Sequence, residues 1–464
     1  MEDKRLEALY PSDSWGKEIK EVLNFVEKGQ SVQLIGIPGV GRSNLLGLLS
    51  YNRNVRIKHL GEDEQVKYHF VLINFSEIKD KPLSEVIKFI FLSLIDSLRL
   101  RNILKDADAK KELETASSIF NNSLATGDSL VIFNALKRTV DFLCLEKDLS
   151  VILIFDRFED YIPNVSQEFF ANLRALRNRA KYKFSVVFSL KRPIEDILEP
   201  EIYFDFSEFL QGNTVYIQIY DKPSFEFRIK HLEEVDNRKI PEDVIKKVLN
   251  LTSGHGKLTR LCLEAWLQEI SNSKSRAAGI ASSDARQISN IQAENFLSNA
   301  KIQNSLLDMW NSFTPEESAF IRQLADSGET KQTAPDHLLN IGILADGKIS
   351  IPLFAEFVKR IKPEEEKFVL SASKDEIKRG EVLFSNGLTA LEFRLFKFLL
   401  ENERKILSRE EIINAVWGDL KSTQGVTEAA IDQLIFRLRK KIEQDLNNPK
   451  LIQTIKGRGI SFSQ

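Results

Sequence analysis

The chain has 464 residues and a mass of 53.1 kDa, a length that allows about three domains. Hydrophobic residues make up 42% and charged residues 28%, a balance that excludes a chain disordered over most of its length. The net charge of −2 gives no argument for nucleic-acid binding by the chain as a whole, although basic residues gather between residues 436 and 458. Two cysteines, Cys144 and Cys262, are too few for a disulfide framework or a cysteine-rich zinc site.

The sequence shows no pattern for export or membrane insertion. The residues after Met1 include no apolar stretch of the kind found in signal peptides, and no apolar run approaches the roughly 18 residues that span a membrane. The low cysteine content fits a reducing compartment. We therefore expect a cytoplasmic protein with no membrane partner.

Short apolar runs and helical patterns alternate over the first 205 residues. The apolar runs, typical of parallel strands covered on both faces, are residues 32–35, 70–75, 151–155 and 184–189. Helical patterns at residues 83–100, 131–145 and 169–180 separate them. This alternation predicts an α/β fold built on a parallel sheet.

Changes of composition along the chain predict a multidomain protein. The strand-like runs stop near residue 205, and a mostly helical region with a Ser-, Ala- and Lys-rich stretch at 271–289 follows. A charged break that contains a proline begins at Lys362. The predicted units are an α/β core over 1–205, a helical region and linker over 206–290, a second helical domain over 291–362, a linker over 363–380 and a C-terminal domain over 381–464.

The turn after the first strand-like run carries a phosphate-binding pattern. Residues 36–43 have the spacing G-x-x-x-x-G-K-[ST] of a P-loop, with Arg42 in the lysine position. The glycines Gly36, Gly39 and Gly41 let the backbone wrap a phosphate, and the helix that follows adds its positive N-terminal dipole. Ser43 supplies a hydroxyl for Mg²⁺. The alternatives are a glycine turn with no ligand, or a site lost because arginine is a larger, flat cation.

Asp156 ends the third strand-like run, where it can hold Mg²⁺ through water or be no more than a solvated strand end. Together with the glycine loop it resembles the AAA+/STAND group of P-loop ATPases, over about residues 15–290. In that group a catalytic glutamate directly follows the aspartate, but here Arg157 does, and Glu159 and Asp160 are out of register. The resemblance implies Asp156 and Glu159 as catalytic candidates, and ATP or ADP with Mg²⁺ that is bound but hydrolysed slowly or not at all.

The same resemblance implies two nucleotide-sensing positions. Ser189 ends the fourth strand-like run, where the group keeps a polar sensor of the γ-phosphate. Residues 253–260 resemble its helical lid, with Arg260 as the sensor arginine although the usual proline is absent; His255 we expect to be a loop or packing histidine rather than a base. The domain over 291–362 resembles the winged-helix unit that packs on the ATPase in STAND proteins, and we assign it no DNA contact.

The last 84 residues predict three helices followed by a two-stranded wing. Thr389 and Ser408 are helix caps, each with a glutamate three residues later, and residues 428–443 form the third helix. The motifs are Leu388-Thr389, residues 407–411, 416–418 and 437–442, and Gly457-Arg458-Gly459. Together they closely resemble the OmpR/PhoB-type winged-helix DNA-binding domain, in which the third helix enters the major groove and the wing touches the minor groove.

Helical spacing divides the third helix into a buried apolar stripe and a polar face that predicts contacts to double-stranded DNA. On this face Gln433 can pair with adenine, Arg437 with guanine, and Phe436 can contact a thymine methyl. The predicted phosphate and minor-groove contacts are Arg439, Lys440, Lys441 and, at the tip of the wing, Arg458. The alternative is that this basic segment is only a solvated helix face.

These features predict a transcription regulator that is switched by a nucleotide. OmpR/PhoB-type response regulators carry a phosphoacceptor receiver, but the N-terminal part here has a P-loop instead. The input is therefore nucleotide state, or an unknown effector sensed through the ATPase, and self-association is one way for it to act. Two alternatives stay open: an active ATPase of the replication-initiator type, and a STAND-type signalling or defence sensor whose winged helix binds a protein.

Overall fold

The computed structural model describes residues 5–464 with gaps at 101–106, 127–128, 277–292, 330–332, 362–366, 380–381, 419–427, 444–445, 447–448 and 456–457. Most of the predicted Ser-, Ala- and Lys-rich linker therefore lies outside the described residues. The chain divides into two compact units. Unit 1 comprises residues 1–36, 41–217 and 222–227, and unit 2 comprises residues 37–40, 218–221 and 228–464.

Unit 1 is built on a parallel five-stranded sheet with the order β2-β3-β4-β1-β5. The strands are β1 (Val32–Ile35), β2 (Tyr68–Asn74), β3 (Ser150–Asp156), β4 (Phe184–Leu190) and β5 (Thr214–Tyr216). The first four lie at the predicted apolar runs, and β4 is buried along its whole length because helices cover both faces of the sheet. The α/β prediction is confirmed.

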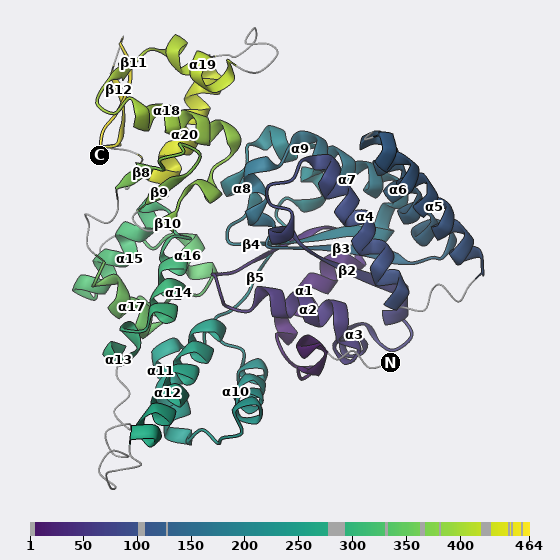
Figure 1. The fold of residues 1–464 in the computed structure, drawn as a ribbon, viewed down its shortest axis with the longest axis horizontal. Helices are drawn as coiled ribbons and strands as arrows, with labels where there is room; N and C mark the ends of the chain where they lie inside the picture. Colours follow the sequence, from purple (N-terminus) through teal and green to yellow (C-terminus); the bar gives the residue numbers. More distant parts are fainter. Residues whose placement is uncertain are drawn as a thin grey trace. The chain divides into compact units, whose positions relative to one another are not determined.

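The helices of unit 1 connect successive strands and pack on the two faces of the sheet. Figure 1 shows α1 to α3 on one side of the strands and α4 to α7 and α9 on the other. Their bounds are α1 (Gly16–Glu27), α2 (Arg42–Tyr51), α3 (Arg53–Leu60), α4 (Leu83–Leu100), α5 (Ala107–Thr126), α6 (Ser129–Asp141), α7 (Gln167–Ala180), α8 (Ile194–Ile197) and α9 (Pro200–Leu210). The core between sheet and helices is rich in phenylalanine; the rings of Phe158 and Phe188, for example, are 5.0 Å apart.

The sheet continues past the predicted domain boundary at residue 205. Strand β5 pairs with β1, with Val215 opposite Leu34, so it is an edge strand of the same sheet. The predicted boundary is wrong at this point because β5 has three residues, too few to show as an apolar run. In the part of the chain that the structure describes, no helix is both long and apolar enough to cross a membrane.

Unit 2 begins with helices that follow the sheet. They are α10 (Lys222–Asp236), of which the first residues belong to unit 1, α11 (Glu242–Thr252) and α12 (Gly256–Arg276). Next come α13 (Ala293–Leu297), α14 (Ala300–Trp310), α15 (Pro315–Ser327), α16 (Asp336–Asn340), the hairpin of β6 (Leu344–Ala345) and β7 (Lys348–Ile349), and α17 (Pro352–Val358). Thr314 and Glu317 form a capping box, which fixes the start of α15.

The C-terminal part of unit 2 has its own hydrophobic core. A sheet of β8 (Phe368–Leu370), β9 (Ile377–Arg379) and β10 (Val382–Leu383) precedes α18 (Ala390–Glu401), β11 (Ile406–Leu407), α19 (Arg409–Trp417) and α20 (Glu428–Ile442). The hairpin of β12 (Ile452–Ile455) and β13 (Gly459–Phe462) follows and pairs with β11 in the order β11-β13-β12. This is the predicted arrangement of three helices and a wing, and the winged-helix prediction is confirmed.

The C-terminal domain starts earlier than the sequence indicated. The prediction of a linker over 363–380 is wrong for its described residues from Phe368 onward, because Phe368 and Ile377 are buried in the domain core. The Phe368 ring lies 4.9 Å from the Phe396 ring of α18, and the side chain of Gln464 bonds both the N–H and the carbonyl of Phe368 at 2.7 Å. Strands of two or three residues between charged side chains show no alternating pattern, so they could not be predicted from the sequence.

Candidate functional sites

The glycine loop lies between the end of β1 at Ile35 and the start of α2 at Arg42. Gly39 has a φ of 83° and Gly41 a φ of 125°, conformations that favour glycine, while the N–H of Gly36 donates to the carbonyl of Leu190 at 3.3 Å. Ser43, the second residue of α2, is exposed. The predicted loop is thus a strand–turn–helix connection that presents the N-terminus of a helix, the arrangement that suits an anion.

Two buried polar atoms lie at the ends of the neighbouring strands. Strand β3 ends with Asp156, which is 6% exposed, and β4 carries the fully buried Ser189 opposite Leu34 of β1. Among the described residues, neither Asp156 Oδ1 nor Ser189 Oγ has a hydrogen-bond partner. Because such atoms are costly to bury unsatisfied, they indicate a place for a bound polar group.

The chemistry of these residues fits a nucleotide with Mg²⁺. Carboxylate and hydroxyl oxygens are the ligands that Mg²⁺ prefers, and it usually takes one or two from the protein and the rest from phosphates and water. Asp156 and Ser43 provide that number. Within the described ranges no group of three or more His, Cys, Asp or Glu side chains is placed to hold a metal ion.

Arg42, the arginine in the lysine position, forms an ion pair with Glu159. Its Nη2 lies 2.7 Å from Glu159 Oε1 and its Nη1 lies 3.4 Å from Oε2, and the two side chains are only 10% and 14% exposed. Burial alone raises the pKa of Glu159, but the positive charges of Arg42 and Lys191 and the Arg42 hydrogen bond outweigh it, so this pKa lies below its ordinary value. The carboxylate predicted as catalytic is therefore held by the loop arginine.

The residues beside Glu159 also differ from a catalytic arrangement. Arg157, in the position of the expected glutamate, is exposed and forms an ion pair with Asp160 at 2.9 Å. Burial raises the pKa of Asp160, with Arg157 acting in the opposite direction. In this structure each carboxylate near Asp156 is thus paired with an arginine, which leaves neither as an obvious base for water.

The turn before α12 lies against the glycine loop. The N–H of Lys257 donates to the carbonyl of Gly39 at 3.0 Å, and His255 Nε2 lies 3.0 Å from the carbonyl of Pro38. A Cβ placed on Gly39 would lie 2.8 Å from Lys257 Cβ, so no side chain fits at this glycine. The predicted sensor Arg260 instead lies exposed on α12 and pairs with Glu264 at 2.8 Å. Lys257, which has no role in the sequence prediction, contacts Gly39 through its backbone N–H and the aliphatic part of its side chain.

His255 is a neutral, fully buried packing histidine, as the sequence suggested. A carbonyl oxygen only accepts, so Nε2 carries the ring proton and donates it to Pro38, while Nδ1 accepts from the N–H of Leu258 at 3.3 Å. Burial, together with Arg228 and Lys257, lowers the pKa of His255 to about 3. The histidine therefore connects the glycine loop to α12 through one fixed tautomer.

Helix α20 carries the candidate nucleic-acid interface. Its apolar stripe is buried in the domain core, whereas Gln433 and Phe436 are exposed, Phe436 by 56%. Arg437 and Lys440 are half-buried along the same face. Arg409, the first residue of α19, forms an ion pair with Asp432 at 2.6 Å that ties α19 to α20. The exposed aromatic ring among polar side chains suits contact with base edges rather than with a protein core.

Two of the predicted phosphate contacts are engaged inside the domain. Arg439 donates to the carbonyl of Ile452 from Nε (3.0 Å) and Nη2 (2.8 Å), and Nη2 also donates to Thr454 Oγ1 at 2.9 Å. Lys441 Nζ lies 2.6 Å from the Glu392 carboxylate and 2.9 Å from the carbonyl of Gly387. Within the domain these bonds tie α20 to the wing and to α18, while the phosphate contacts of both cations stay a prediction.

A further predicted DNA contact, Arg458, lies in the turn of the wing. Arg458 is exposed between β12 and β13, and its N–H donates to the carbonyl of Ile455 at 2.9 Å. Its neighbours at 456–457 lie outside the described residues. Of the predicted DNA contacts, Gln433, Phe436 and Arg458 are exposed, and Arg437 and Lys440 are half-buried.

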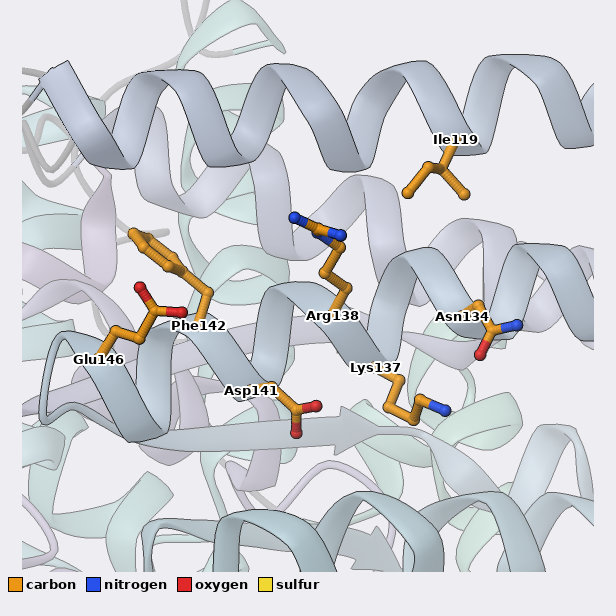
Figure 2. Close-up of a pocket in the computed structure, with 7 residues that line it drawn as sticks. All are labelled: Ile119, Asn134, Lys137, Arg138, Asp141, Phe142 and Glu146. Atoms are coloured by element: carbon orange, nitrogen blue, oxygen red, sulfur yellow. The ribbon is translucent and has the colours of Figure 1, made fainter.

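A cavity of about 340 Å³ lies beside α6 in unit 1 (Figure 2). Its lining combines both charges with two apolar side chains: Ile119, Asn134, Lys137, Arg138, Asp141, Phe142 and Glu146. Asp141 is already bonded by Arg179 Nε, at 2.7 and 3.0 Å. Because the lining carries two basic and two acidic side chains, its charge favours no class of ligand, and we assign no ligand to this cavity.

Comparison with known proteins identifies the C-terminal domain. Residues 385–462 match the family described as "Transcriptional regulatory protein, C terminal". The C-terminal domain belongs to this family. Over 75 residues this transcriptional-regulator domain is 44% identical to the regulatory protein VirG of Rhizobium rhizogenes, a match that covers 16% of this chain and 30% of VirG. The chain thus spans under a third of that relative.

Two further matches show how far the likeness extends. The response regulator MprA of Mycobacterium avium is 33% identical over 111 residues, which cover 22% of this chain and 46% of MprA. A Walker-type ATPase of Pyrococcus abyssi superposes on 77% of this chain and 98% of its own, with 16% identity and a TM-score of 0.43.

Proposed function

We propose that this protein is a DNA-binding transcription regulator whose P-loop unit acts as a nucleotide-dependent switch. The observation that carries the first half is the α20 face, on which a family-matched domain exposes Gln433 and Phe436 beside Arg437. A planar guanidinium or amide reaching base edges gives sequence preference, and Lys440 and Arg458 add phosphate or minor-groove contacts. Double-stranded DNA is the proposed partner.

The second half rests on the glycine loop and the two unsatisfied strand-end atoms. The backbone of residues 36–43 would hold the phosphates, and Asp156 and Ser43 would hold Mg²⁺. Bound ATP or ADP supplies charge to this site, and the number of its phosphates distinguishes two states. Because Glu159 and Asp160 are paired with arginines, we propose that hydrolysis is slow or absent. A switch needs nucleotide affinity to differ between two states of the protein.

Selection of duplexes from a randomised pool by the full-length protein tests both halves. The pool is offered without nucleotide, with ADP–Mg²⁺ and with ATP–Mg²⁺. We expect enrichment of a motif that depends on nucleotide, and two copies of it in one duplex if the protein self-associates. If the same motif is enriched with and without nucleotide, the proposed nucleotide switch is wrong. If no motif is enriched in any condition, the proposed sequence-specific DNA binding is wrong.

Variants separate the two halves. Arg437→Ala is expected to lose preference at one or two base positions, about 1–3 kcal/mol of discrimination, whereas Lys405→Ala, an exposed cation of the same domain, keeps the motif. Gly41→Asp puts a carboxylate at a φ of 125° in the loop and is expected to abolish the nucleotide effect while the motif persists. A nucleotide response that survives Gly41→Asp would refute the coupling.

A further inference from the structure

The loop arginine already has an anionic partner. Arg42 stands at the first position of α2, with its guanidinium directed to Glu159 in the segment after β3, and both nitrogens of its fork approach the carboxylate, at 2.7 and 3.4 Å. Both side chains are almost completely buried. The guanidinium of the loop arginine is thus engaged by a carboxylate of the same unit.

A carboxylate and a phosphate compete for the same face of a guanidinium. Arginine binds either one through two parallel N–H···O contacts, and a lysine in this position would act instead as a single point charge. One guanidinium group cannot form both two-point contacts through the same face at the same time. A phosphate held by the backbone of residues 36–41 can therefore recruit Arg42 only if the contact with Glu159 is given up.

A second positive charge acts on Glu159 besides Arg42. Lys191, which follows the end of β4, lowers its pKa along with Arg42. The adjacent carboxylate, Asp160, is held by Arg157 and does not approach Arg42 through any contact found in the described residues. The surroundings of Glu159 can thus support an exchange in which Arg42 leaves and the carboxylate is not left isolated in a buried site.

We propose that Glu159 competes with nucleotide phosphate for Arg42, so that the Arg42–Glu159 pair is the low-affinity state of the loop and nucleotide binding exchanges the partner of Arg42. This inference rests on the proposed nucleotide site. It gives Glu159 an affinity-setting role instead of a catalytic one. It also gives the switch a defined local event, because the segment after β3 is released from α2 when the arginine moves.

The test is nucleotide affinity of the full-length protein, measured by calorimetry with ATP–Mg²⁺ and ADP–Mg²⁺. Glu159→Gln keeps the size of the side chain and an oxygen for Arg42 but removes the competing charge. We expect it to bind nucleotide roughly 10- to 100-fold more tightly than the natural protein, the effect of losing a charge-assisted hydrogen bond. Asp160→Asn, which removes the neighbouring charge, is the matched control and is expected to stay within about threefold.

A double variant shows whether the effect acts through Arg42. We expect the double variant Arg42→Gln/Glu159→Gln to bind nucleotide no more tightly than the single variant Arg42→Gln, because Glu159 then has no arginine to compete for. The inference is overturned if Glu159→Gln binds nucleotide no more tightly than the natural protein, or if Asp160→Asn gains as much affinity as Glu159→Gln. Either result leaves the proposed nucleotide site intact. Absence of binding at millimolar nucleotide in every folded variant, checked by circular dichroism, overturns the site itself and the inference with it.

Discussion

Replacement of Lys441 by alanine is expected to destabilise the transcriptional-regulator domain rather than to weaken a DNA contact. Lys441 is 15% exposed and its partner Glu392 is 1% exposed, so the variant leaves a buried carboxylate without its cation. That loss costs about 3 kcal/mol, the lower end of the range for broken buried pairs, because Glu392 keeps its capping bond of 2.8 Å from the N–H of Thr389. For a domain of this size the cost corresponds to a Tm lower by roughly 12 °C or more.

Lys440→Ala is the matched comparison, since it removes the same charge from the neighbouring residue, which lies half-buried on the predicted DNA-binding face of α20. Hydrogen exchange followed by mass spectrometry on the full chain should show lost protection across residues 385–462 for Lys441→Ala and little change, within about 0.5 kcal/mol, for Lys440→Ala. In DNA binding, Lys440→Ala should reduce the slope of log K against log salt by about one. The reasoning would be refuted if the Lys441→Ala domain were as stable as the natural one and if its DNA binding showed a smaller slope of log K against log salt.

Two further predictions concern the domain boundary and the loop histidine. Phe368→Ala should destabilise the C-terminal domain by about 3 kcal/mol, because the side chain is 4% exposed in its core, whereas Val369→Ala, 58% exposed, should change little in the same urea titration. His255 takes up a proton in the unfolded chain near pH 6.5 but in the folded one only near pH 3. Below pH 6.5 this group should therefore lower the stability by about 1.4 kcal/mol per pH unit, and His255→Gln should remove that slope between pH 6.5 and about pH 5, above the range in which carboxylates titrate.

The sequence was most informative where a local pattern has one structural solution. The P-loop spacing, the two capping boxes at Thr389 and Ser408, and long apolar runs such as the one in β3 each specify a backbone conformation by themselves. Strands of two or three residues do not, because the alternation of side chains needs four or more positions to show. For this reason β5 and the sheet that begins at Phe368 became visible only through their pairing.

The candidate sites were predictable as locations but not as contacts. Helical spacing correctly put Arg439 and Lys441 outside the apolar stripe of α20, yet long side chains at the edges of a stripe can reach back across the domain. Whether a cation meets solvent or a buried acid depends on residues distant in the chain. Glu392 is 49 positions from Lys441, and Glu159 is 117 positions from Arg42.

The two departures of the P-loop unit from its expected pattern belong together in the structure. Taken alone, Arg42 is a lysine replaced by a bulkier cation, and Glu159 is a glutamate displaced from its catalytic register by Arg157. In the folded unit the two meet as one buried pair, so each compensates the charge that the other would leave unpaired. This buried pair is the contact that would have to break for Arg42 to reach a nucleotide phosphate, so the proposed exchange acts on both departures at once.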